Sequence, residues 1–143
     1  MVADRLAVLG VVAAVVAVVW LGLRWRAARY RRRPATDLVR GRPLVLAFST
    51  PDCVPCRTLQ KPALLELQRR YPGQVDVREV DAAADPALAG RFGILTVPST
   101  VLISGDGVVR AINQGAVGWE RLAAQLELNG KGPRARMAAR TAR

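Results

Sequence analysis

The pattern of apolar and polar residues divides the chain into an apolar N-terminal segment and a patterned domain. Residues 6–23 form an apolar run without a charge. Leu44–Phe48 is a shorter apolar run, for which we expect a strand buried on both faces. Cys53–Arg70 predicts the longest amphipathic helix of the domain, kinked at Pro62. The apolar face of this helix is expected to consist of Leu59, Ala63, Leu64 and Leu67.

The rest of the domain predicts three further strands and two further helices. In chain order these are a strand at 74–81, a short helix from Asp85–Pro86 to about Gly93, strands at 100–103 and 108–112 joined by a hairpin loop, and a helix at 119–128. We expect the first three strands to be parallel, with right-handed helical crossovers, and the fourth to be antiparallel. The predicted fold class is α/β, a four-stranded mixed sheet flanked by helices.

The apolar run at residues 6–23 predicts a transmembrane helix. Eighteen helical residues span about 27 Å, near the thickness of a hydrocarbon core. A buried core helix is disfavoured, because it would be apolar all round with nothing left to cover it. Trp20, Trp25 and Tyr30 fit an aromatic belt at one interface. Arg24-Trp25-Arg26 follows where a signal peptide would have small residues, so we interpret the run as an uncleaved anchor.

The positive charge of the chain lies in two flanks of the domain. The net charge is +11, but residues 43–129 carry eight basic and nine acidic side chains, a net −1. Residues 24–42 hold eight arginines and one aspartate, and residues 130–143 hold five basic side chains and no acidic one. A basic globular surface for nucleic acid is therefore not supported. The first flank is interpreted as a topology signal in contact with anionic lipid, the second as a disordered tail.

The arginines after the apolar run set the expected topology. Six arginines lie from Arg24 to Arg33, against Arg5 on the other side of the run. The positive-inside rule then places the domain in the cytoplasm. The excess of Arg over Lys also hints at a GC-rich bacterial genome. The predicted organisation is a short segment (1–5), a transmembrane helix (6–23), an Arg-rich juxtamembrane linker (24–42), a domain (43–129) and a basic tail (130–143).

The chemistry of the chain is concentrated in Cys53-Val54-Pro55-Cys56, which holds its only two cysteines. This spacing at a strand-to-helix junction lets the thiols close a disulfide across one helical turn and open it again. The helix N-terminus favours the thiolate of Cys53, which is the expected nucleophile. A static disulfide closing so small a loop would contribute little stability. Two thiolates without histidine do not fill a tetrahedral metal site in one chain, which leaves only a site shared between two chains.

Three further motifs make residues 43–129 resemble the thioredoxin family. They are Phe48 ahead of Cys53-Val54-Pro55-Cys56-Arg57, Phe92-Gly93-Ile94 before Thr96-Val97-Pro98-Ser99-Thr100, and Gln114-Gly115-Ala116 after the hairpin. The resemblance implies a thioredoxin fold and thiol–disulfide exchange with protein substrates, with electrons from an upstream donor. It implies no cofactor and no metal.

The resemblance also implies roles for individual residues. Cys53 is the attacking thiolate and Cys56 the resolving thiol of a redox-active Cys53–Cys56 disulfide. Pro55 shapes the start of the helix. Pro98 matches a cis-proline that lies against the cysteine pair, and Val97 offers backbone groups to an extended substrate.

The chain departs from the family pattern beside the cysteines. Asp52 stands where Trp is common, and its carboxylate disfavours the thiolate of Cys53, whereas Arg57 acts in the opposite direction. Ala47 stands where thioredoxins often have a buried aspartate that accepts the proton of the second cysteine. That role is vacant, or it is taken by water or by Glu79.

We therefore predict a membrane-tethered thiol–disulfide oxidoreductase with a cytoplasmic domain. One alternative keeps the chemistry on the extracytoplasmic side, for disulfide reduction or cytochrome maturation. The other alternative is a non-catalytic binding module with the same fold.

Overall fold

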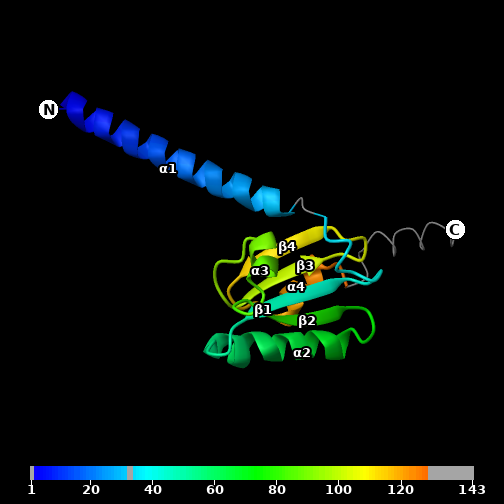
Figure 1. Cartoon of the computed structure of the whole chain (residues 1–143). Coiled ribbons are helices and arrows are strands. Elements are labelled where there is room, and N and C mark those ends of the chain that lie inside the picture. The colour runs from blue at the N-terminus through cyan, green and yellow to red at the C-terminus, as the bar shows by residue number, and fades with distance from the viewer. Residues whose placement is uncertain (1, 32–33, 129–143) are drawn as a thin grey trace.

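The computed structural model describes residues 2–31 and 34–128 (Figure 1). The predicted basic tail, residues 130–143, lies outside the described residues. The chain begins with a long helix, α1 (Val2–Arg31), and continues into a small α/β domain. The elements of the domain are β1 (Leu44–Ser49), η1 (Cys56–Gln60), α2 (Lys61–Arg70), β2 (Asp76–Asp81), α3 (Pro86–Arg91), β3 (Ser99–Ile103), β4 (Val109–Gln114) and α4 (Trp119–Gln125).

Helix α1 projects away from the sheet and its covering helices (Figure 1). Its segment Ala7–Arg26 is long and apolar enough to cross a membrane, and none of this segment is buried within the described chain. The exposed apolar surface agrees with the expectation that α1 is not a core helix. A signal sequence near an N-terminus has the same length and composition.

Four strands form one mixed sheet in the order β2-β1-β3-β4. Strand β1 is parallel to β2, with Phe48 opposite Val80, and antiparallel to β3, with Phe48 opposite Ser99. Strands β3 and β4 form the predicted antiparallel hairpin. The predicted four-stranded mixed sheet flanked by helices is confirmed.

The predicted direction of the third strand is wrong, because β3 runs antiparallel to β1. The connection from β2 contains only the six-residue helix α3. Such a helix rises about 9 Å, whereas a returning crossover must travel the length of a six-residue strand, about 20 Å. The chain therefore enters β3 at the edge of the sheet where β1 and β2 end. This reversal brings the loop before β3 to the carboxyl end of β1.

Alternate residues of β1 pack into separate cores on the two faces of the sheet. Leu44, Leu46 and Phe48 belong to the core under α3, and Val45 and Ala47 belong to the core under α2 and α4. All five are at most 5% exposed, which confirms the predicted strand buried on both faces. Since the cysteines follow β1 after a short loop, they are attached to a strand that is buried on both faces.

The segment before β1 packs onto the domain. Ala35 is fully buried in the core under α3, and its N–H donates to the carbonyl of Gly107 at 2.8 Å. Arg91 donates to both carboxylate oxygens of Asp37, at 2.6 and 2.7 Å, and these hydrogen bonds lower the pKa of Asp37 below its ordinary 3.8. The Asp37–Arg91 pair therefore stabilises the fold fully above about pH 3.8, the ordinary pKa of an aspartate. This contribution is lost as the pH falls through the lowered pKa of Asp37. Packing thus begins at residue 35, within the segment interpreted as a linker.

The predicted helix from Cys53 to Arg70 is interrupted. Residues Cys56–Gln60 form the π-helical segment η1, which is followed by α2. Pro62 has no N–H to donate and its ring crowds the carbonyl four residues earlier, so the helical ladder widens just before it. The wider turn rotates the residues that precede α2. Leu59, predicted on the apolar face, is 60% exposed, and Gln60 is buried in its place.

We predict that Gly107→Ala destabilises the protein more than Gly73→Ala. Both glycines have positive φ, +85° and +69°, which costs about 1–2 kcal/mol for any other residue. A Cβ at Gly73 meets open space, whereas at Gly107 it would lie 2.7 Å from the backbone of Thr36. The close contact should add about 1–3 kcal/mol. Urea unfolding measures both variants, and equal free energies of unfolding would contradict the prediction.

Candidate active site

The two cysteines lie at the carboxyl end of β1 and are joined by a disulfide, with their Cα atoms 5.3 Å apart. The loop that leads to them is closed by a hydrogen bond from the N–H of Cys53 to the carbonyl of Thr50, at 3.1 Å. Cys53 is 8% exposed and Cys56 is 7% exposed. A partner therefore reaches these sulfurs only by docking on the surface around them.

The backbone after the first cysteine is directed at its sulfur. The N–H of Cys56 donates to the Sγ of Cys53 at 3.2 Å. A donor in this position stabilises negative charge on Cys53 Sγ, because a hydrogen bond to the charged form of a group favours that form. Pro55 precedes η1 with helical φ and ψ of −64° and −24°, which is compatible with its expected part in starting the helix.

The residues expected to tune the cysteines lie on the surface. The guanidinium of Arg57 donates to the carbonyl of Pro51 at 2.8 Å, so this side chain holds the loop before the cysteines. Asp52 is exposed in the same loop. Both side chains are therefore exposed beside the cysteines, and Arg57 is hydrogen-bonded to the backbone of the loop.

The loop before β3 lies across from the end of β1. The Val97–Pro98 peptide bond is cis, as the resemblance implied. Because Ser99 is paired with Phe48, Pro98 lies beside the residues that follow Phe48 and lead to Cys53. The antiparallel direction of β3 therefore brings Pro98 and the cysteine loop to one edge of the sheet.

Local hydrogen bonds hold the Pro98 loop but leave one residue available. The hydroxyl of Ser99 donates to the carbonyl of Thr96 at 2.6 Å, and the carbonyl of Pro98 accepts from the N–H of Gly115 at 2.8 Å. Among the described residues, none hydrogen-bonds the backbone N–H or C=O of Val97.

Gln60 supports the site, and the sequence analysis missed it. Its side chain is 3% exposed; Oε1 accepts from the N–H of Val117 at 3.1 Å, and Nε2 donates to the carbonyl of Val117 at 3.4 Å. Gln60 thereby joins the helix after the cysteines to the turn that contains Gly115. The available signal was its spacing of four residues from Cys56, which places both on one side of a helix.

Two hollows adjoin these residues. A groove of about 480 Å³ runs along the Pro98 loop, with Thr50, Ile94, Leu95 and Val97 among its mainly apolar walls. A smaller cavity of about 80 Å³ lies behind Cys56, between β1, β2 and the start of α2. This cavity has room for a water molecule, which occupies about 30 Å³.

The smaller cavity has a polar rim. Lys61, Gln60 and Glu79 line it together with Ala47, which is the register partner of Glu79 in β2. Ala47 stands where thioredoxins often have a proton-accepting aspartate, and the sequence analysis left water or Glu79 to replace it. The structure places Glu79 in the wall of the cavity behind Cys56. The described residues contain no group of three or more His, Cys, Asp or Glu that is able to hold a metal ion.

Comparison with known proteins identifies this arrangement. The sequence model of the family described as thioredoxin matches residues 35–127, well over half of the chain. The chain belongs to the thioredoxin family. The matched range begins at the buried Ala35, so the packed segment before β1 is part of the thioredoxin domain.

Curated relatives of this thioredoxin domain come from several bacteria. The thioredoxin of Synechocystis sp. is 32% identical over 85 residues, which cover 59% of this chain and 78% of that protein. Thioredoxin 1 of Nostoc sp. is 31% identical over 74 residues, which cover 49% of this chain and 68% of that protein.

Solved structures show the same fold. A structure titled "Structure of a malarial protein" is 23% identical with a TM-score of 0.56, covering 61% of this chain and 96% of that one. A second, titled as thioredoxin-2 of the malaria parasite protein secretion machinery, has the same identity and TM-score and is covered to 82%. Family membership and the Cys53–Cys56 disulfide make the protein a thiol–disulfide oxidoreductase, which confirms the predicted enzyme class.

Proposed function

We propose that this protein is a membrane-tethered oxidoreductase that reduces disulfides in protein substrates on the cytoplasmic side. The observation that carries the proposal is the Cys53–Cys56 disulfide beside the Val97–Pro98 loop. An upstream donor, of a kind that the site does not specify, returns the disulfide to the dithiol.

Cys53 is the nucleophile in this proposal. In the reduced protein its thiolate, supported by the N–H of Cys56, attacks one sulfur of the substrate disulfide. The substrate's other sulfur leaves as a thiolate and takes up a proton. The thiolate of Cys56 then attacks Cys53 Sγ and releases the second substrate thiol. Two electrons pass to the substrate, and the Cys53–Cys56 disulfide forms.

Val97 and Pro98 receive the substrate. The free N–H and C=O of Val97 pair with an extended peptide, as an added strand does at a sheet edge. The apolar groove along the loop takes side chains of that peptide; Leu95, in its wall, is 73% exposed. Backbone pairing and apolar contact together suit protein disulfides of varied sequence.

Glu79 accepts the proton of Cys56. The resolving thiol must ionise to attack, and the cavity behind it is lined by one carboxylate, Glu79, and two cations, the guanidinium of Arg57 and the ammonium group of Lys61. A water molecule in this cavity carries the proton from sulfur to carboxylate. The ammonium group favours the thiolate that remains.

Helix α1 tethers the domain. Its segment Ala7–Arg26 has the length and composition of a span, and Arg24 lies over the ring of Trp20 at 4.7 Å, near the predicted interface. The arginine-rich flank contacts anionic lipid on the cytoplasmic face. The alternative is an extracytoplasmic domain that serves disulfide reduction or cytochrome maturation.

We predict that the full-length protein in detergent speeds the reduction of insulin by dithiothreitol. Cys53→Ser should return the rate to that of dithiothreitol alone, because the attacking sulfur is lost. Reduced Cys56→Ser protein, freed of dithiothreitol and mixed with insulin, should accumulate a mixed disulfide that is visible by mass spectrometry. Thr58→Ser, which keeps the hydroxyl that donates to the carbonyl of Val54, should retain activity. If the wild-type protein does not speed insulin reduction, the proposed reductase activity is contradicted.

Glu79→Gln should slow the release of substrate from the mixed disulfide by about a hundredfold, the lower range for loss of a general base. Attack by Cys53 should be unaffected, because the cavity that Glu79 lines is bordered by Cys56 and not by Cys53. Stopped-flow measurement with a dye-labelled disulfide peptide separates the two steps. Glu120→Gln on the exposed side of α4 removes the same charge. Equal release rates in the two variants would assign the proton to water alone.

In intact cells, a membrane-impermeant thiol reagent should not label the cysteines, even after an impermeant reductant is added. Permeabilised cells should be labelled at both positions, and a Cys53→Ser, Cys56→Ser double variant gives the background, because these are the only cysteines. Labelling before permeabilisation would favour the extracytoplasmic alternative. Recovery of the protein in the soluble fraction would contradict the tether.

A further inference from the structure

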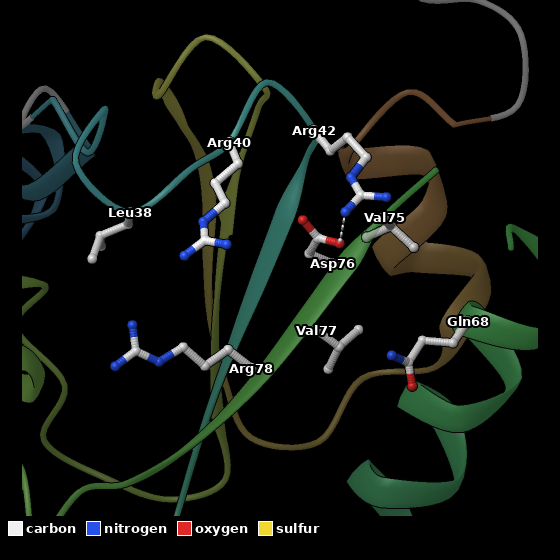
Figure 2. A pocket seen from close by; sticks show the side chains of 8 residues that line it. All are labelled: Leu38, Arg40, Arg42, Gln68, Val75, Asp76, Val77 and Arg78. Carbon is white, nitrogen blue, oxygen red and sulfur yellow. Dashed lines mark ion pairs between the residues drawn. The ribbon is translucent and has the colours of Figure 1, made fainter. Parts of the chain in front are cut away.

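A third hollow lies at the end of the sheet opposite the cysteines (Figure 2). Its volume is about 460 Å³, and it opens where β1 and β2 begin. Arg40 and Arg42, from the segment before β1, and Arg78, from β2, contribute guanidinium groups to it. Three cationic side chains from two separate segments thus meet at one hollow.

Only part of this charge is neutralised. Asp76 is the one acidic residue that lines the hollow, and it pairs with Arg42 at 3.1 Å. Within residues 2–31 and 34–128, neither Arg40 nor Arg78 makes an ion pair or a hydrogen bond through its side chain. Figure 2 shows both extending to the Leu38 side of the hollow, while Arg42 faces Asp76. Two positive charges are left facing the same space.

The concentration is local, because residues 43–129, which include Arg78 and Asp76, carry a net charge of only −1. Like charges that share a hollow repel each other unless an anion lies between them. The planar fork of a guanidinium donates two parallel hydrogen bonds to the oxygens of a phosphate or carboxylate. Two or three such forks around one space suit a phosphate group, which offers several oxygens and more than one negative charge.

The hollow also has an apolar part. Leu38 is half-buried in its wall beside the core under α3, whereas Val75 and Val77 belong to the core on the other face of the sheet. A phosphate joined to a small organic group would place the phosphate among the arginines and the organic group against Leu38. Such a ligand would also connect the segment before β1 to β2.

We propose that Arg40, Arg42 and Arg78 form a binding site for a phosphate group, carried by an anionic phospholipid head group or by a soluble phosphate ester. The site uses none of the residues of the redox reaction, but Arg40 and Arg42 belong to the arginine-rich flank of the proposed function, so its phospholipid form rests on the proposed tether. Arg40 lies nine residues after the end of α1 at Arg31, so a membrane that holds α1 would supply head groups nearby.

The test uses the full-length protein in neutral detergent micelles. The probes are inorganic phosphate, glycerol 3-phosphate, dihexanoyl phosphatidylglycerol and, as the zwitterionic control, dihexanoyl phosphatidylcholine. Saturable shifts of the Asp76, Val77 and Arg78 amide signals in nuclear magnetic resonance titrations report binding. Saturation by phosphate and glycerol 3-phosphate identifies a soluble ligand, and saturation by phosphatidylglycerol alone identifies a head group; either supports the site.

The variants separate a built site from general charge. Arg40→Gln with Arg78→Gln should weaken binding about tenfold for each guanidinium removed. Arg110→Gln with Arg121→Gln removes the same charge from exposed positions on β4 and α4 and should leave affinity unchanged. Arg40→Lys with Arg78→Lys keeps the charge without the fork and should give an intermediate affinity.

Three results would overturn the site. They are no saturable shift with any phosphate probe, equal weakening in the two glutamine double variants, and saturation by a glutamate-rich peptide but not by phosphate. Insulin reduction by the Arg40→Gln, Arg78→Gln protein should equal that of wild type. Absence of phosphate binding would therefore not contradict the proposed reductase activity. Absence of insulin reduction would likewise not contradict the phosphate site.

Discussion

Burial of β1 on both faces is the constraint on which the rest of the structure depends. Its odd and even residues enter separate cores, so the strand has no freedom to rotate or slip without exposing one apolar set. The cysteines follow the end of β1 after a short loop, so this fixed strand holds them in place. A thiol pair that must meet a substrate sulfur in line benefits from such a fixed base, because a small displacement greatly slows a positioned reaction.

The second half of the site comes from the opposite direction along the chain. A connection too short to return across the sheet makes β3 antiparallel, and Pro98 then arrives beside the cysteine loop. Gln60 joins the helix after the cysteines to the turn that binds Pro98 through Gly115. Three segments far apart in sequence therefore form one supported site. A change at Gln60 would act on both cysteines and Pro98 without touching a substrate.

The parts of the structure predicted correctly rest on local patterns. The apolar run of β1, the hairpin and the cysteine spacing each report a short-range preference, and the resemblance added Pro98. The errors concern geometry that local patterns do not contain. Strand direction depended on the length of α3, and Leu59 and Gln60 exchanged places because Pro62 widened the turn before it. The packing of Ala35 against Gly107 was invisible because it joins residues 72 positions apart, 107 less 35.

That packing has a consequence for how far the enzyme reaches. Four peptide units separate Arg31, at the end of α1, from the buried Ala35, so covalent geometry limits the distance to about 14 Å. With α1 in a bilayer, this short connection would keep the domain close to the membrane surface, and the domain would move mainly by lateral diffusion with its anchor. Its partners would then be selected by where they present their disulfides, at the height of the lipid surface, as much as by their sequence.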